Sequence, residues 1–123
     1  MNTLDLLEKH PKSTIVVKQW FLERMIESFK DETVPEDFKD YMKQQGIDTS
    51  RIASMVSGNP RILFSVLDEQ HVYVQVTINL QNLNKPAFTW SINGKEKGEW
   101  YENRVEAEKQ AIIEAFKTLE EKL

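Results

Sequence analysis

The sequence predicts an α+β fold in which N-terminal helices precede a four-stranded antiparallel meander, and a long C-terminal helix packs on that sheet to give two layers. Three observations support this fold class. Apolar residues recur at three- and four-residue steps before Pro60. They then alternate with polar residues in Val72–Leu80, which indicates a strand with one dry face, and the helical period returns after Asn103.

The length indicates a single domain. A chain of 123 residues can bury one core without disulfides or metals and is short for two domains. We therefore expect one domain over residues 1–123, with a helical half at 1–58 and the sheet plus the last helix at 61–123.

The first two expected helices are a short one and a long one. Residues 3–9 suit a short helix whose leucines dock on a larger body, because the segment stops before Pro11. Ser13 or Thr14 can then cap a longer helix that runs through Lys30. Its apolar stripe contains Val16, Val17, Trp20, Phe21, Met25, Ile26 and Phe29.

Two shorter helices complete the first half. Thr33 with Glu36 forms a capping-box pattern that opens the third helix, and Gly46 is its expected stop. Asp48 or Thr49 can cap the fourth helix.

After Pro60 the expected elements are strands. Ile62–Leu67 is apolar on both sides, which favours a strand covered on both faces. Asp68–His71 is the turn into the long alternating strand at Val72–Leu80, and Phe88–Ile92 forms the third strand.

A hairpin follows the third strand. Asn93-Gly94 favours a tight turn because both residues accept a positive φ. The loop is either these two residues alone or extends to Gly98. We prefer the longer loop because it places the aromatic pair Trp100-Tyr101 near Trp90.

The closing helix begins at a second capping pattern, Asn103 with Glu106. Its apolar stripe contains Ala111, Ile112, Ala115, Phe116, Leu119 and Leu123. The apolar faces of the three longest elements predict this core: Trp20, Phe21, Met25, Val74, Val76, Ile78, Trp90, Ile112, Phe116 and Leu119.

Composition excludes several classes of function. The net charge of −4 is spread evenly, so neither half resembles a polyanion-binding protein and no nucleic-acid partner is expected. The lack of cysteine removes thiolate chemistry and is compatible with a reducing cytoplasm. No apolar run approaches a membrane span and the first residues do not resemble a leader, so we expect a soluble cytoplasmic protein without a membrane partner.

His71 is the best catalytic candidate, because Asp68 or Glu69 could orient its ring as a base. The same four residues are also ordinary turn composition, and this second interpretation is favoured. The acidic stretch at 27–40 could bind a hard cation, but its spacing matches no calcium loop and a solvated surface is favoured. We therefore assign no catalytic residue, no metal ligand and no cofactor.

Surface aromatics are the best candidates for partner binding. Trp100 and Tyr101 are adjacent, so in a strand they face opposite ways and one of them should be exposed. Tyr73 is expected on the polar sheet face with Gln75, Thr77, Asn79, Thr89 and Ser91. Aromatic residues are enriched in protein interfaces, so Trp100, Tyr101 and Tyr73 are the predicted partner-binding residues.

The order of helix, three strands and helix is similar to that of the double-stranded-RNA-binding domain. That family contacts RNA through a lysine-rich start to its last helix. The matching stretch here, Glu102–Glu108, is mostly acidic. The similarity therefore concerns topology and argues against RNA binding.

A second similarity covers residues 86–121. An aromatic strand and hairpin at Phe88–Gly94 are followed by Tyr101–Phe116, where alanines and a phenylalanine form one helical stripe. This arrangement resembles the ending of small uncharacterised proteins carried by phages and prophages. The resemblance implies an accessory protein that modulates host or phage machinery by binding, and it assigns no catalytic residue.

Together these observations favour a non-enzymatic accessory protein that binds a protein partner or a second copy of itself. One alternative is a nucleic-acid-associated module that uses the polar sheet face. The other is a small hydrolase or metal-dependent enzyme centred on His71. No small-molecule ligand is indicated.

Overall fold

The computed structural model describes residues 2–28, 35–97 and 99–123, with the backbone alone at positions 39, 42, 45, 96 and 97. The chain divides into two compact units, Asn2–Pro60 and Arg61–Leu123. The single domain expected over residues 1–123 stays a prediction.

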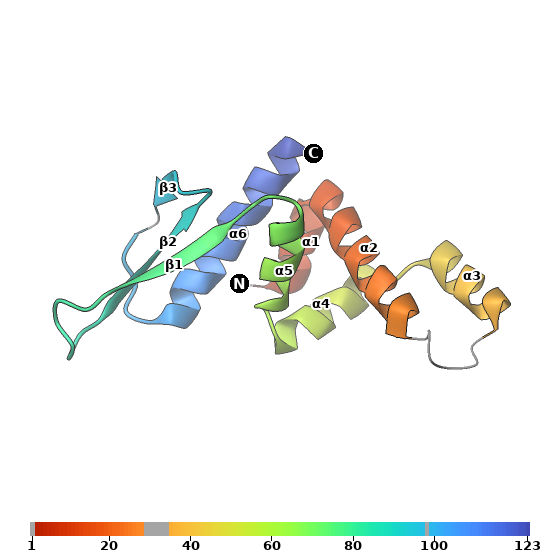
Figure 1. The fold of residues 1–123 in the computed structure, drawn as a ribbon, viewed down its shortest axis with the longest axis horizontal. Helices are drawn as coiled ribbons and strands as arrows, with labels where there is room; N and C mark the ends of the chain where they lie inside the picture. Colours follow the sequence, from red (N-terminus) through yellow and green to blue (C-terminus); the bar gives the residue numbers. More distant parts are fainter. Residues whose placement is uncertain (1, 29–34, 98) are drawn as a thin grey trace. The chain divides into compact units, whose positions relative to one another are not determined.

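The first unit is helical, as the sequence predicts. Its described helices, coloured red to yellow-green in Figure 1, are α1 (Thr3–Lys9), α2 (Pro11–Ser28), α3 (Glu36–Gln45) and α4 (Thr49–Gly58). Side-chain hydrogen bonds fix α1 against its neighbours. The Thr14 hydroxyl of α2 donates to the Leu7 carbonyl over 2.5 Å, and the Ser57 hydroxyl of α4 donates to Thr3 Oγ1 over 3.2 Å.

The long helix starts earlier than expected. It begins at Pro11 rather than after a cap at Ser13 or Thr14, and both of these side chains are buried inside it. Proline suits the first helical position because its fixed φ is helical and its missing N–H would have no partner there. The expected continuation to Lys30 and the cap at Thr33 lie outside the described residues.

The end of α3 and the start of α4 lie where the sequence predicts them, but the predicted capping bond is not made. Gly46 has a φ of +69° directly after α3 and ends that helix, as predicted. Asp48 occupies the cap position of α4, but its side chain caps no backbone N–H. Instead its carboxylate accepts a 2.7 Å hydrogen bond from the Ser50 hydroxyl, and this bond lowers the pKa of Asp48 below its ordinary value.

The strand predicted at Ile62–Leu67 is wrong, because these residues lie in a helix, α5 (Ile62–Glu69). Leu63, Val66 and Leu67 are buried at helical spacing, while Ser65 is exposed. A run that is apolar at nearly every position carries neither period, so its pattern could not separate a buried strand from a short helix.

The four-stranded meander is therefore wrong as well. The sheet is an antiparallel pair of β1 (Val74–Asn79) and β2 (Ala87–Ile92), to which the two-residue β3 (Glu96–Lys97) is attached at β2. Asn93 and Gly94 both have positive φ, as the hairpin signal predicts. The turn contains three residues, 93–95, because Ile92 pairs with Glu96. It is therefore longer than the two-residue turn and shorter than the loop to Gly98 that were the two expected alternatives.

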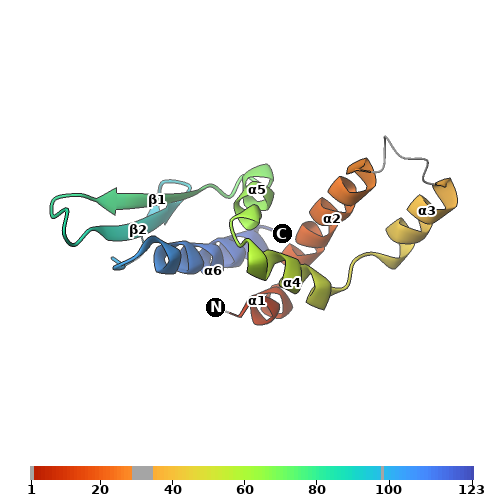
Figure 2. The ribbon, with the colours of Figure 1, turned by 90° about the horizontal axis from the view of Figure 1, so that it is seen from below.

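One face of the β1–β2 pair is covered by α6 (Arg104–Lys122), as Figures 1 and 2 show. This helix begins at its predicted cap, where Asn103 Oδ1 accepts from the Glu106 amide over 2.9 Å. Arg61, directly before α5, forms a forked ion pair with Glu108, with distances of 2.8 and 3.2 Å. At the other end, Lys122 Nζ donates to the Gln70 carbonyl over 2.6 Å, so α6 is bonded to both flanks of α5.

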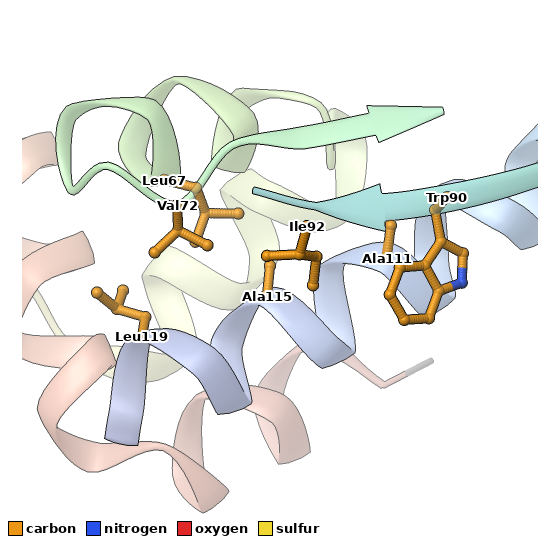
Figure 3. Close-up of a cluster of buried hydrophobic side chains, with 7 residues drawn as sticks. All are labelled: Leu67, Val72, Trp90, Ile92, Ala111, Ala115 and Leu119. Atoms are coloured by element: carbon orange, nitrogen blue, oxygen red, sulfur yellow. The ribbon is translucent and has the colours of Figure 1, made fainter. Parts of the chain in front are cut away.

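A cluster of buried side chains joins α5, the sheet and α6. Figure 3 shows Trp90 and Ile92 directed from β2 toward the α6 residues Ala111 and Ala115. The small alanine side chains let the helix lie close to the sheet. The remaining buried members of this cluster are Leu67, Val72 and Leu119.

The predicted core list is largely confirmed residue by residue. The following members are buried: Trp20, Phe21, Trp90, Ile112, Phe116 and Leu119. Met25, Val74 and Val76 are partly buried, whereas Ile78 is 37% exposed. Ile78 lies in an edge strand, so it has a sheet neighbour on one side only. Leu123, expected on the α6 stripe, is 46% exposed at the helix end.

Candidate functional site

An extra residue beside β2 determines which ring of the aromatic pair is exposed. Along the sheet, Ser91 pairs with Lys97, and further on Phe88 forms an isolated bridge with Tyr101. Between these pairs β2 has two residues, whereas the returning segment has three. A ladder without the extra residue would place Trp100 opposite Phe88 instead of Tyr101.

The extra residue determines which side chain of the aromatic pair lies on the face covered by α6. Antiparallel partners project to the same face of a sheet, and Phe88 lies on the face covered by α6. The Tyr101 ring is therefore partly buried and packs against the core cluster. Trp100 is excluded from that face and is 56% exposed. The expectation that one ring of the pair is exposed agrees with these positions.

The bridge to β2 is well formed. The Phe88 amide donates to the Tyr101 carbonyl over 2.8 Å, and the Tyr101 amide donates to the Phe88 carbonyl over 2.7 Å. The Thr89 hydroxyl adds a 3.0 Å bond to the Glu99 carbonyl. The backbone is therefore hydrogen-bonded to β2 at Glu99 and at Tyr101, the residues on either side of Trp100.

Trp100 and Tyr101 line a groove of about 420 Å³ together with residues 84–87 and Glu102. Asn82 shapes the turn that precedes Pro86, because its Oδ1 accepts from the Asn84 amide over 3.1 Å and its backbone carbonyl accepts from the Lys85 amide. Pro86 and Ala87 then lead into β2.

The lining of the groove suits an apolar side chain of a protein. Pro86, Ala87 and the two aromatic rings supply apolar surface, and exposed aromatic rings are common anchors in interfaces. Lys85 and Glu102 supply one charge of each sign, so the groove has no net preference for a cation or an anion. We name these lining residues, Asn84–Ala87 and Trp100–Glu102, the Trp100 groove.

Tyr73 lies away from the Trp100 groove. Its amide donates to Asn93 Oδ1 and its carbonyl accepts from the Asn93 amide, both over 2.8 Å, at the hairpin end of β2. Phe88, which pairs with Tyr101, lies five residues before Asn93, a separation of about 17 Å at the usual strand rise. Tyr73 is 52% exposed, but it does not form one site with the other predicted residues.

His71 terminates α5. The His71 amide donates to the Asp68 carbonyl and the Val72 amide donates to the Leu67 carbonyl, while His71 itself has a φ of +60°. These two bonds around a left-handed residue are the Schellman arrangement that ends many helices. The partner of the His71 ring is the Tyr73 hydroxyl, 2.9 Å from Nδ1 at the surface, rather than the Asp68 or Glu69 carboxylate of the catalytic alternative.

We expect His71→Gly to raise the free energy of unfolding by about 1 kcal/mol, because glycine adopts the left-handed conformation without a clash at Cβ. His71→Ala is the matched control, since it removes the ring but keeps Cβ, and it should give no gain. Urea denaturation followed by circular dichroism measures both. A loss of stability in the glycine variant would show that the ring contact with Tyr73 outweighs the backbone strain.

The described residues contain no group of three or more histidine, aspartate or glutamate side chains placed to share a metal ion. Of the acidic stretch at 27–40, residues 29–34 lie outside the described part of the chain. The described helices also include none that is long and apolar enough to cross a membrane.

Residues 84–87 were not predicted as part of a site. Their loop was recognised, but they meet Trp100 only because of the bridge between Phe88 and Tyr101. No local pattern in residues 81–86 signals that pairing.

The fold and the groove define an α+β chain with an aromatic-lined surface groove and no recognisable catalytic constellation among its described residues. Comparison with protein-family models, with curated proteins and with solved structures finds no match to this chain.

Proposed function

We propose that this protein is a non-enzymatic accessory protein that acts by binding a protein partner in the Trp100 groove. One observation carries the proposal: a tryptophan that is 56% exposed lies between two residues hydrogen-bonded to β2, beside a groove with apolar lining. Leaving a large aromatic ring in water gains nothing for folding, whereas burying it in a partner contributes strongly to binding.

The mode of binding follows from the lining. Trp100 and Pro86 present apolar surface to an apolar side chain of the partner, and Tyr101 joins this lining to the core cluster against which it packs. Lys85 and Glu102 contact the rim of the bound segment. Tyr73 belongs to a different part of the surface and is not needed for this contact.

The net charge of −4 supports a protein rather than duplex nucleic acid as the partner, because counterion release needs clustered lysine and arginine side chains. The absence of cysteine is in keeping with a cytoplasmic protein. The similarity of residues 86–121 to small phage and prophage proteins supports an accessory role of that type.

Trp100→Ala tests the proposal. We expect the substitution to weaken partner binding by about 2 kcal/mol, roughly thirtyfold, while the melting temperature stays nearly unchanged because the ring is largely exposed. The control is Tyr41→Ala in α3, which removes an aromatic ring that is 57% exposed in the other unit.

The measurement is affinity capture from the source cells with the parent chain and both variants, followed by quantitative mass spectrometry. Proteins that depend on Trp100 but not on Tyr41 are then purified and titrated against each variant. Equal recovery of every protein by the parent and Trp100→Ala, or equal affinities in the titrations, would contradict the proposal.

A further inference from the structure

β1 leaves a row of backbone groups unpaired along one edge of the sheet. Among the residues that the structure describes, β1 pairs with β2 alone. The Asn93 amide donates to the Tyr73 carbonyl, which makes residue 73 a hydrogen-bonded position. These positions alternate along an antiparallel strand, so the N–H and C=O groups of Val74, Val76 and Ile78 point away from β2.

The other strand agrees with this assignment. Phe88 pairs with Ile78 across the sheet, yet its own amide and carbonyl bond Tyr101 on the opposite side. Phe88 and Ile78 are therefore a pair without mutual backbone bonds, as the alternation requires. Hydrogen bonds at both ends of the sheet, at Tyr73 and at Phe88, therefore show that the even-numbered backbone groups of β1 point away from β2.

This edge carries no charged residue, no proline and no bulge, which are features that usually prevent strands from pairing. Proteins protect exposed edges with charged residues, proline or bulges. No aspartate, glutamate, lysine, arginine or proline occurs from Gln70 to Asn84, in a chain in which 29% of the residues are charged. The pairing of β1 with β2 is also uninterrupted over the whole strand. Ile78 and Leu80 are 37% and 55% exposed beside this edge.

We propose that the β1 edge pairs with the β1 edge of a second copy of this chain. The two strands run antiparallel about a twofold axis at Thr77. The axis places Ile78 opposite Val76 and Leu80 opposite Val74 of the second copy. Thr77 then lies opposite its own equivalent, and Gln75 lies opposite Asn79.

This register is self-consistent on both faces. Even-numbered residues of one copy lie opposite even-numbered residues of the other, so the outward-pointing N–H and C=O groups of both strands can hydrogen-bond. On the α6 face, the exposed side chains of Ile78 and Leu80 gain apolar neighbours from the second copy. Polar residues meet polar residues on the other face, with a Thr–Thr pair at the centre. The result is one continuous sheet with the α6 helix of each copy on the same face.

The charge pattern favours a second copy over a foreign strand. A twofold axis at Thr77 places Thr77 beside its own equivalent and the other residues of the strand beside one another, so a strand that carried several like charges would repel its copy. The uncharged stretch from Gln70 to Asn84 removes that repulsion and offers no charge with which to select a different partner. This inference is independent of the proposed function, because the Trp100 groove adjoins the side of β2 that faces away from β1.

Sedimentation equilibrium across a concentration series tests the inference. The parent chain should show a weak, concentration-dependent dimer. Thr77→Lys and Thr77→Glu should each weaken it at least about tenfold, because each places like charges opposite one another at the axis. An equimolar mixture of the two variants should restore association, since opposite charges then meet.

Ser91→Lys is the matched control. Ser91 lies on the same polar face as Thr77, and its replacement adds the same charge as Thr77→Lys. Ser91 is on β2, however, one strand away from the twofold axis. The dissociation constant of the Ser91→Lys dimer should be close to that of the parent dimer. Circular dichroism checks that all three variants keep the parent fold, because Thr77 is exposed whereas Ser91 is partly buried and pairs with Lys97.

Amide hydrogen exchange provides a second measurement that depends on the register. The amides of Val76 and Ile78 should become protected as concentration rises, while those of Gln75 and Thr77 are protected throughout by β2. The inference is overturned if the parent chain stays monomeric up to about 1 mM, where even a millimolar dissociation constant would be detected. It is also overturned if Thr77→Lys dimerises as well as Ser91→Lys.

Discussion

Replacing Trp90 by alanine should lower the free energy of unfolding by about 3–5 kcal/mol. The ring is 7% exposed and fills the space between β2 and the alanines of α6 (Figure 3). Alanine would leave a cavity there, because the strand and the helix are held by other contacts and cannot fully collapse. Urea denaturation followed by far-ultraviolet circular dichroism measures the change.

Trp90→Phe separates packing from hydrogen bonding at the same position. The buried Nε1 of Trp90 has no hydrogen-bond partner within the described part of the chain, and an unsatisfied buried donor costs about 1–3 kcal/mol. Phenylalanine removes that donor and keeps most of the ring volume, so the loss should be less than about 2 kcal/mol. If the phenylalanine variant were as unstable as the alanine variant, the cavity argument would be wrong.

Leu119→Ala should have an effect of similar size, about 2–5 kcal/mol. Leu119 is completely buried and contacts the cluster that joins α5, the sheet and α6. Leu123→Ala, on the same helix but 46% exposed, is the control and should change the free energy of unfolding by less than about 0.5 kcal/mol. Equal effects of the two substitutions in urea titrations would mean that the end of α6 packs differently.

Much of the fold could be predicted where one period dominates. The alternation in Val72–Leu80 identifies β1, and the stripe that includes Ala111, Ile112 and Phe116 identifies the buried face of α6. The strand predicted at Ile62–Leu67 was wrong because almost every residue in this segment is apolar, so neither the helical nor the strand period is visible. Its helical spacing becomes evident only when the buried residues Leu63, Val66 and Leu67 are known.

The candidate site was predictable only in part. Adjacent aromatics after a hairpin suggested that either Trp100 or Tyr101 is exposed, and the sequence alone could not choose between them. The choice depends on one extra residue in the returning segment, which is visible only once Phe88 is seen to pair with Tyr101. The groove depends on the same non-local pairing, which is why Pro86 was not recognised as a lining residue.

The proposal that a partner occupies the Trp100 groove is tested most directly by fluorine NMR of the chain labelled with 5-fluorotryptophan. The chain has three tryptophans, of which Trp20 and Trp90 are buried and Trp100 is largely exposed, so each resonance reports a distinct environment. Single Trp→Phe variants assign the signals. When a captured and purified partner is added, we expect the Trp100 resonance to shift and the Trp100 ring to become protected from solvent, with the Trp90 resonance unchanged. Binding of a partner that leaves the Trp100 resonance unshifted, and the Trp100 ring as accessible to solvent as before, would show that the partner does not occupy the Trp100 groove.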